Sequence, residues 1–241
     1  MRKGIITILI VGLCGFLWIA AQSWSKQLEV SKVTVRGTMH IDADEILRIA
    51  ALSDTVLFED IDLGELQYRV KQHPYVRTAS VNRDFPATVR ITVQERKPDA
   101  LLVGSRMAIL DDENIVMPVR YGNSMESLPV ISGEFSIPQT GDTLRHSGVD
   151  RALQIIRATR ASDEIMHHLF SEMRVLEGGS LVAYSTDHGV PIFLGEASNA
   201  RQLIAFKEFW LQEVVPVGAD QIQSIDLRYD DQIVTRWQNG R

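Results

Sequence analysis

The chain has 241 residues, of which 45% are hydrophobic and 23% charged, so it is too apolar for a disordered tail and is expected to fold. Lys and Arg number 25 against 31 Asp and Glu, a net charge of −6, and this excess of acid argues against a nucleic-acid-binding protein, which needs a basic face. The single cysteine, Cys14, excludes an intrachain disulfide and every multi-cysteine metal site.

The N-terminal segment is predicted to cross a membrane. No charged residue lies between Lys3 and Lys26, and the residues between them are almost all apolar. A helix over residues 5–24 would span roughly 30 Å, the thickness of the hydrocarbon core of a bilayer. The cations that precede it place the N-terminus in the cytoplasm. We therefore expect a cytoplasmic stub at residues 1–4, a transmembrane helix at residues 5–24 and the rest of the chain outside.

The same segment also fits a cleaved signal peptide, because Ala21, Gln22 and Ser23 offer small residues at a suitable spacing for cutting after Ser23. Its apolar run exceeds the ~7–15 residues of a usual signal core, which favours an uncleaved anchor. Under both interpretations the chain from Leu28 onward lies beyond the membrane.

The next segment predicts a strand followed by two helices. Apolar and polar residues alternate over residues 28–36, as in a half-buried strand. Two helices follow, and each is opened by an aspartate three residues before a glutamate: Asp42 before Glu45, and Asp62 before Glu65. This spacing is typical of a capping box, in which the two side chains satisfy the free N–H groups of a helix start.

Two further strands complete this module. Pro74 stops the second helix, residues 75–82 are extended, and residues 89–94 show the cleanest alternation of apolar and polar residues in the chain. We expect a sheet covered on one face by two short helices. The strand that ends at Pro98 is expected to lie at the edge of this sheet, free to pair with another chain.

The run from Val81 to Pro98, with its Phe85-Pro86 turn and its Glu-Arg-x-Pro exit, resembles the bacterial cell-division family FtsQ/DivIB. The resemblance implies that residues 28–97 form a POTRA module of order β-α-α-β-β and that residues 98–241 form an FtsQ-type β-domain. The fold class is then α+β: a single N-terminal transmembrane helix, a POTRA module, and a mixed β-domain with two amphipathic helices.

The second domain shows short strands and two helical patterns. One helix carries a stripe of apolar side chains, Leu203, Phe206, Trp210 and Val214, which favours a place in the core over contact with a partner. The predicted elements are a hairpin of residues 100–111 and 115–119, a helix of residues 149–170, a meander of residues 173–176, 181–185 and 190–194, a helix from residue 199 to before Pro216, and a terminal hairpin of residues 225–229 and 233–237.

The terminal hairpin carries the candidate site residues. Its run Ile225 to Asp230, followed by a tryptophan at Trp237, is similar to the terminal strands of FtsQ/DivIB proteins. In that family this edge accepts a β-strand from FtsB, which travels with FtsL. The resemblance implies that Tyr229 and Trp237 are aromatic contacts and that Arg228 is the charged contact. The alternative is that both aromatic rings pack on their own sheet.

Catalytic and metal-binding motifs are missing from the sequence, which has no Gly-x-Ser-x-Gly, His-Glu-x-x-His or Walker loop. His167 and His168 are adjacent, so on a helix they point about 100° apart and cannot both bind one metal. We expect a solvated helix end there, with His40, His73, His146 and His188 at the surface. The prediction is therefore no enzyme, and no catalytic, cofactor-binding or metal site.

Two functions of different classes remain. The favoured one is a non-enzymatic scaffold of the divisome in the inner membrane at the division septum, with its domains in the periplasm. It would bind FtsB and FtsL by strand addition at the C-terminal edge, an upstream divisome component at the POTRA module, and membrane lipid through residues 5–24, but no nucleic acid. The alternative is an exported POTRA-containing periplasmic chaperone or translocation accessory, since POTRA modules also receive unfolded strands.

Overall fold

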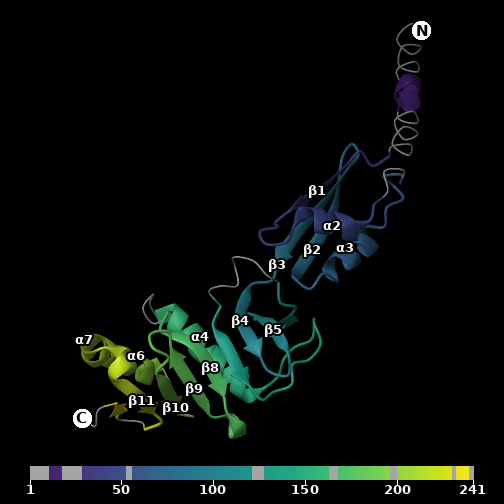
Figure 1. Cartoon of the computed structure of the whole chain (residues 1–241). Coiled ribbons are helices and arrows are strands. Elements are labelled where there is room, and N and C mark those ends of the chain that lie inside the picture. Colours follow the sequence, from purple (N-terminus) through teal and green to yellow (C-terminus); the bar gives the residue numbers. More distant parts are fainter. Residues whose placement is uncertain are drawn as a thin grey trace. The chain divides into compact units, whose positions relative to one another are not determined.

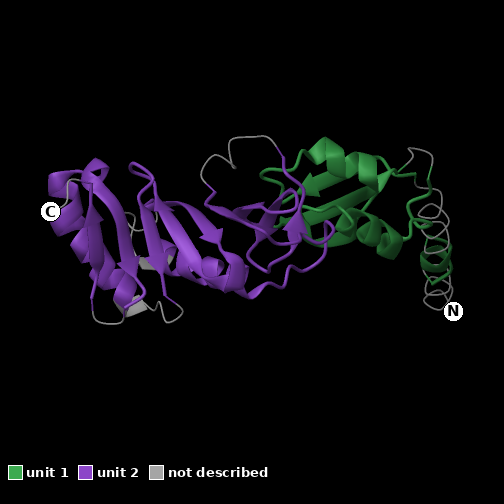
Figure 2. Ribbon diagram, turned by 60° about the horizontal axis from the view of Figure 1, so that its bottom comes forward, with its two compact units in different colours: residues 1–96 green, residues 97–241 purple. Residues whose placement is uncertain are grey.

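The computed structural model describes residues 11–17, 29–52, 56–120, 128–162, 168–195, 200–229 and 232–238. The chain divides into two compact units, Met1–Arg96 and Lys97–Arg241, coloured separately in Figure 2. Residues 11–17 are helical, but most of the predicted span of residues 5–24, the stub of residues 1–4 and the cleavage position after Ser23 lie outside the described residues. Within the described part of the chain, no helix is long and apolar enough to cross a membrane.

The first unit has the predicted order of strand, two helices and two strands (Figure 1). Its elements are β1 (Lys32–Arg36), α2 (Ala43–Ala50), α3 (Leu63–Lys71), β2 (Val76–Asp84) and β3 (Thr88–Glu95). The sheet order is β1-β3-β2, with β1 parallel and β2 antiparallel to β3. The prediction that the strand before Pro98 is an edge strand is therefore wrong. The crossover through α2 and α3 brings β1 alongside β3, so β3 is central and the edges are β1 and β2.

The two helix starts show the predicted aspartate caps. Asp42 accepts a hydrogen bond from the backbone N–H of Asp44 (3.0 Å), and Asp62 accepts from Gly64 (2.9 Å) and Glu65 (3.0 Å). These bonds satisfy N–H groups that have no partner within the helix.

The glutamate after the first cap also contacts a buried histidine. Glu45 Oε1 lies 3.1 Å from Nε2 of His73, and Nδ1 of that ring accepts from the backbone N–H of Tyr75 at 3.2 Å. His73 is buried, so the prediction of a surface histidine at this position is wrong. Its ring is kept inside because both nitrogens have partners.

The core of the first unit lies between β3 and the helices. Val89 and Ile91 are fully buried and Val93 nearly so, while Ile46 and Leu66 come down from α2 and α3. The alternation of β3 thus places one face under the helices, as predicted.

The second unit is a nine-stranded sheet with helices, in the order β12-β11-β10-β9-β8-β7-β4-β5-β6. Its strands are β4 (Pro98–Val103), β5 (Met107–Asp111), β6 (Val116–Met117), β7 (Val130–Gly133), β8 (Phe170–Val175), β9 (Leu181–Ser185), β10 (Pro191–Leu194), β11 (Ile222–Leu227) and β12 (Val234–Trp237). Its helices are α4 (Ser147–Ser162), α6 (Ala200–Phe209), the π-helical turn Trp210–Val214, α7 (Val215–Val217) and the short 3₁₀ turns Glu177–Gly179 and Ala219–Gln221.

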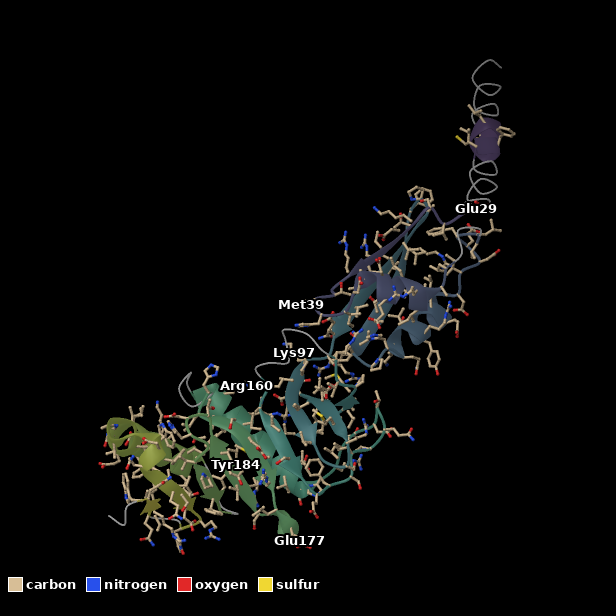
Figure 3. The ribbon with its side chains drawn as sticks, viewed as in Figure 1. Glu29, Met39, Lys97, Arg160, Glu177 and Tyr184 are labelled. Carbon is tan, nitrogen blue, oxygen red and sulfur yellow. The ribbon has the colours of Figure 1, made fainter. Side chains whose placement is uncertain are left out.

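One face of this sheet packs against α4 and α6. Phe206 and Trp210 are buried, and the Phe206 ring stacks on Phe170 with centroids 6.0 Å apart. The prediction that the stripe through Phe206 and Trp210 belongs to the core is confirmed. Alternate residues of the strands, such as Tyr184 on β9 (Figure 3), point to the opposite face. We call it the helix-free face, because no helix of the described residues packs on it.

Several predicted boundaries in this unit are wrong. Residues 100–111 are not one strand, because β4 and β5 form a hairpin within this run. The predicted turn after Asp111 is confirmed, since β5 pairs antiparallel with β6 across it. The helix predicted over residues 149–170 ends at Ser162 in the described chain, and Phe170 starts β8.

The last helix does not stop before Pro216. The chain widens into the π turn, where Val215 N–H bonds Trp210 C=O, and Pro216 occupies the first turn of α7. There the missing N–H of proline costs little. The meander and the terminal hairpin are confirmed.

Candidate partner-binding edge

The nine-stranded sheet is closed at one end and open at the other. Beside β6, the segment that follows it covers the edge, with Val116 N–H bonded to Asp142 C=O (2.9 Å) and Gly141 N–H to Val116 C=O (2.8 Å). At the other end, β12 pairs with β11, and no strand of the described residues pairs with the outer side of β12. An edge of this kind presents backbone N–H and C=O groups that another chain can bind.

The pairing of β12 with β11 fixes which side chains face which side. Thr235 is opposite Ile225 and Trp237 is opposite Ile222, so both point to the helix-covered side. Trp237 is half-buried and packs in part against the core. The hydroxyl oxygen of Thr235 is buried and has no hydrogen-bond partner among the described residues. Val234 and Arg236 point to the helix-free side.

Tyr229 follows the end of β11, with 49% of its surface exposed. The side-chain amide of Gln202 on α6 donates to the backbone C=O of Leu227 (3.3 Å) and of Tyr229 (3.2 Å). The helix therefore holds the backbone at the end of β11, while the phenol ring stays in solvent.

Arg228 is exposed but held in place. Its Nε and Nη2 donate to the two carboxylate oxygens of Asp226 at 2.9 and 2.5 Å, and its backbone N–H donates to the same carboxylate at 3.0 Å. Its guanidinium lies 5.3 Å from the ring centroid of Phe193 on β10, within the range of a cation–π contact. A Cβ atom at Gly195 would stand 3.1 Å from the Cα of Arg228, so glycine allows this close approach.

The charges of this cluster are stable near neutral pH. The hydrogen bond from the Arg228 side chain lowers the pKa of Asp226 and outweighs the raising effect of burial. The same bond raises the pKa of Arg228. Arg236 adds a second cation, so among the described residues of β11, β12 and their ends Arg228 and Arg236 accompany the carboxylate of Asp226.

The structure brings Arg228 and Tyr229 together but places Trp237 at the far end of the hairpin. Trp237 pairs with Ile222, six residues before Arg228, which corresponds to roughly 20 Å along a strand. A strand of about six or seven residues laid along β12 would reach from one end to the other.

The supporting residues Asp226, Phe193, Gly195 and Gln202 are not among the residues predicted for the site. Asp226 could have been found, because residues two apart on a strand share a face. Phe193 and Gln202 could not, because the crossover through α6 that sets β10 parallel to β11 has no local sequence signal.

The described residues contain no group of three or more His, Cys, Asp or Glu side chains arranged to hold a metal ion. His167 lies outside the described residues, and His168 is exposed just before β8. The outer side of β12 has the exposed strand backbone that strand addition requires.

Comparisons with known proteins identify similar chains. Residues 28–96 match the model described as "POTRA domain, FtsQ-type", and residues 100–236 match "FtsQ/DivIB, C-terminal related". The chain is 27% identical to the cell division protein FtsQ of Rhodothermus marinus, over 98% of this chain and 88% of the relative. It is 26% identical to FtsQ of Koribacter versatilis (97% and 69%) and 27% identical to FtsQ of Vibrio cholerae (93% and 82%).

Proposed function

Because the chain belongs to the FtsQ/DivIB family of bacterial cell-division proteins, we propose that it is a non-enzymatic scaffold of the divisome that binds FtsB, together with FtsL, at β12. The partner would add a strand to the open edge. The observation that carries this proposal is that β12 has a strand on one side only among the described residues.

The side chains around the edge support strand addition. Backbone hydrogen bonds give affinity in this mode of binding, and side chains beside the added strand give specificity. Tyr229 and Trp237 are amphipathic aromatic residues and Arg228 is a preorganised cation, which are the residue types enriched at binding hot spots. Arg236, which is exposed on β12 itself, favours an acidic side chain in the partner segment that pairs beside it.

The proposed organisation follows the predicted boundaries. Residues 1–4 are a cytoplasmic stub, residues 5–24 cross the inner membrane once, residues 28–97 are the POTRA domain and residues 98–241 the β-domain in the periplasm. The site of action is the division septum. The POTRA domain would dock an upstream component of the division machinery.

The test is the affinity of the full chain, in detergent or nanodiscs, for a purified FtsB–FtsL complex. Tyr229→Ala is the main variant, because Tyr229 is exposed and its removal leaves the core intact. We expect a loss of about tenfold or more, as for a hot-spot residue. Trp237→Ala should weaken binding as well, with hydrogen exchange in β11 as a check that the hairpin persists.

Tyr68→Ala is the matched control, since this tyrosine is 60% exposed but lies on α3 of the other unit. The Tyr68→Ala variant should bind the FtsB–FtsL complex with the affinity of the parent chain. If Tyr229→Ala and Trp237→Ala both bind like the parent, the hairpin is not the partner site.

Localisation separates the scaffold from the alternative of a periplasmic chaperone or translocation accessory. A fluorescent fusion of the full chain should form bands at mid-cell. A uniform envelope signal would favour the alternative.

A further inference from the structure

At one end of the first unit, the segment that follows the proposed membrane span lies beside two turns of the chain. Ser31 bonds through both its N–H (2.9 Å) and its hydroxyl (3.1 Å) to Ala87 C=O in the turn between β2 and β3. Glu29 forms a β-bridge with Leu57 in the loop between α2 and α3. We call this the tether end, made of residues 29–31, 57–60 and 83–88. Glu29 and Met39 lie at opposite ends of the unit in Figure 3.

The tether end exposes an aromatic side chain. Phe85 is 77% exposed, and Pro86 beside it is also exposed, whereas Ala87 and Val89 immediately after them are buried. Leu57 in the neighbouring loop is 37% exposed. Removing a phenylalanine side chain from water is favourable, so a surface that covers Phe85 would gain free energy from this burial. Single exposed hydrophobic residues are common on protein surfaces. What distinguishes Phe85 is its closeness to the proposed membrane span.

The distance of Phe85 from the membrane is limited by the short segment between the proposed span and Glu29. The proposed membrane span ends at residue 24, five residues before Glu29, and five residues reach at most about 18 Å. The headgroup layer extends about 5–8 Å beyond the hydrocarbon core. The hydrogen bonds of Ser31 to Ala87 hold the Phe85 turn beside the arriving chain. The tether end is therefore confined to the neighbourhood of the headgroups.

Charge does not explain an attraction of this end to a membrane. Its exposed acidic residues are Glu29, Glu59 and Asp60, against Lys32 next to it and Arg83. The guanidinium of Arg83 is in addition bonded to the backbone C=O groups of Phe58 and Ile61. Anionic lipid would gain nothing from this set of charges, so the contact has to be made by the aromatic ring. Tryptophan and tyrosine are enriched at the interface between headgroups and hydrocarbon, and phenylalanine is among the residues that interfacial segments bury there.

We propose that the Phe85-Pro86 turn inserts into the headgroup layer of the bilayer that the chain itself spans. The lipids contacted are the zwitterionic lipids at the bilayer surface. The Phe85 ring provides a second attachment to the membrane, besides the proposed transmembrane helix. The inference rests on the membrane anchor of the proposed function. It goes beyond it, because it assigns a lipid contact to the folded POTRA-type unit and fixes which end of that unit touches the membrane.

The test uses two tryptophan substitutions in the full chain, Phe85→Trp at the tether end and Met39→Trp at the opposite end. Both positions are highly exposed, 77% and 86%, so both variants should fold. Each chain is reconstituted into phosphatidylcholine vesicles whose acyl chains carry bromine near the glycerol, which quenches nearby indoles. The fluorescence of the unsubstituted chain, with its four tryptophans, is subtracted. We expect the added signal of Phe85→Trp to be quenched about twofold or more relative to that of Met39→Trp.

The outcomes separate the anchor from the turn. A parent chain that does not float with the vesicles overturns the anchor and, with it, the inference. A parent that floats while the two added signals are quenched equally, or not at all, overturns the inference and leaves the anchor standing. Stronger quenching of Phe85→Trp that is unchanged when phosphatidylglycerol replaces part of the lipid supports insertion by the ring, and quenching that requires the anionic lipid contradicts it.

Discussion

Replacing Glu95 by glutamine should loosen the first unit, because this carboxylate joins the end of β3 to the loop before α2. Glu95 Oε1 accepts from the backbone N–H groups of Met39 (2.7 Å), His40 (3.0 Å) and Ile41 (2.9 Å), and Oε2 lies 3.0 Å from Nδ1 of His40. The side chain is only 9% exposed. Burial raises the pKa of Glu95, but the hydrogen bonds from Ile41, Met39 and His40 outweigh it and hold the pKa below its usual value.

The expected loss for Glu95→Gln is about 2 kcal/mol at pH 7. A hydrogen bond to a charged group contributes about 1.5–3 kcal/mol, and the amide oxygen of glutamine keeps part of the set. The folded-state pKa is lowered, so the stabilisation is complete above the unfolded-state pKa of about 4.3 and is lost as the pH falls through the folded-state pKa. The gap between parent and variant should therefore shrink in acid.

The assay is urea unfolding of the full chain, read by pulsed hydrogen exchange in peptides from residues 30–96, so that the second unit does not contribute. Glu65→Gln is the control: its side chain is 58% exposed and 3.7 Å from Arg69, and its loss should stay below about 0.5 kcal/mol. This role of Glu95 would be refuted if the two variants lost equal free energies of unfolding. It would also be refuted if the difference between the parent chain and Glu95→Gln were the same at pH 7 and pH 3.

Three further predictions concern the two cores and the edge. Ile91→Asp places a carboxylate at a fully buried position and should abolish exchange protection in the first unit while the second keeps its own; unchanged protection would remove Ile91 from the core. Asp99→Asn should lower the unfolding free energy of the second unit by about 2–3 kcal/mol, since Asp99 is buried and bonded to Arg157 (2.7 Å) and Arg160 (2.5 Å); a loss of about 0.5 kcal/mol or less would contradict this. Asp226→Asn should weaken FtsB–FtsL binding by about three- to tenfold with unchanged circular dichroism, and tighter binding would mean that Asp226 competes for the arginine instead of positioning it.

The first unit was largely predictable because its signals are local. The aspartates at 42 and 62 start their helices as their side chains require, and the alternation of residues 89–94 places Ile91 beneath them. The position of the strands in the sheet was not predictable in this way. Nothing in residues 89–94 indicates that this strand, β3, pairs with β1 on one side and with β2 on the other.

In the second unit, strand boundaries were harder to predict than in the first. The hairpin of β4 and β5 turns at Gly104-Ser105-Arg106, a short break inside an otherwise apolar run, so the run can be taken for one strand although the turn residues are present in the sequence. At the candidate edge, Arg228, Tyr229 and Trp237 came from a family resemblance. The contacts that fix Arg228, to Phe193 across the sheet and to Asp226 on its own strand, needed the strand order.

The two arginines beside β12 also bear on self-association. An unpaired edge strand is a ready template for a second copy of the same protein, which is how many sheets begin to aggregate. In an antiparallel pairing of β12 with itself that sets the Arg236 side chains of the two copies directly opposite each other, the like charges would destabilise the pair. In that register the arginine that favours an acidic partner strand disfavours a second copy of the chain, so self-pairing of the edge is discouraged.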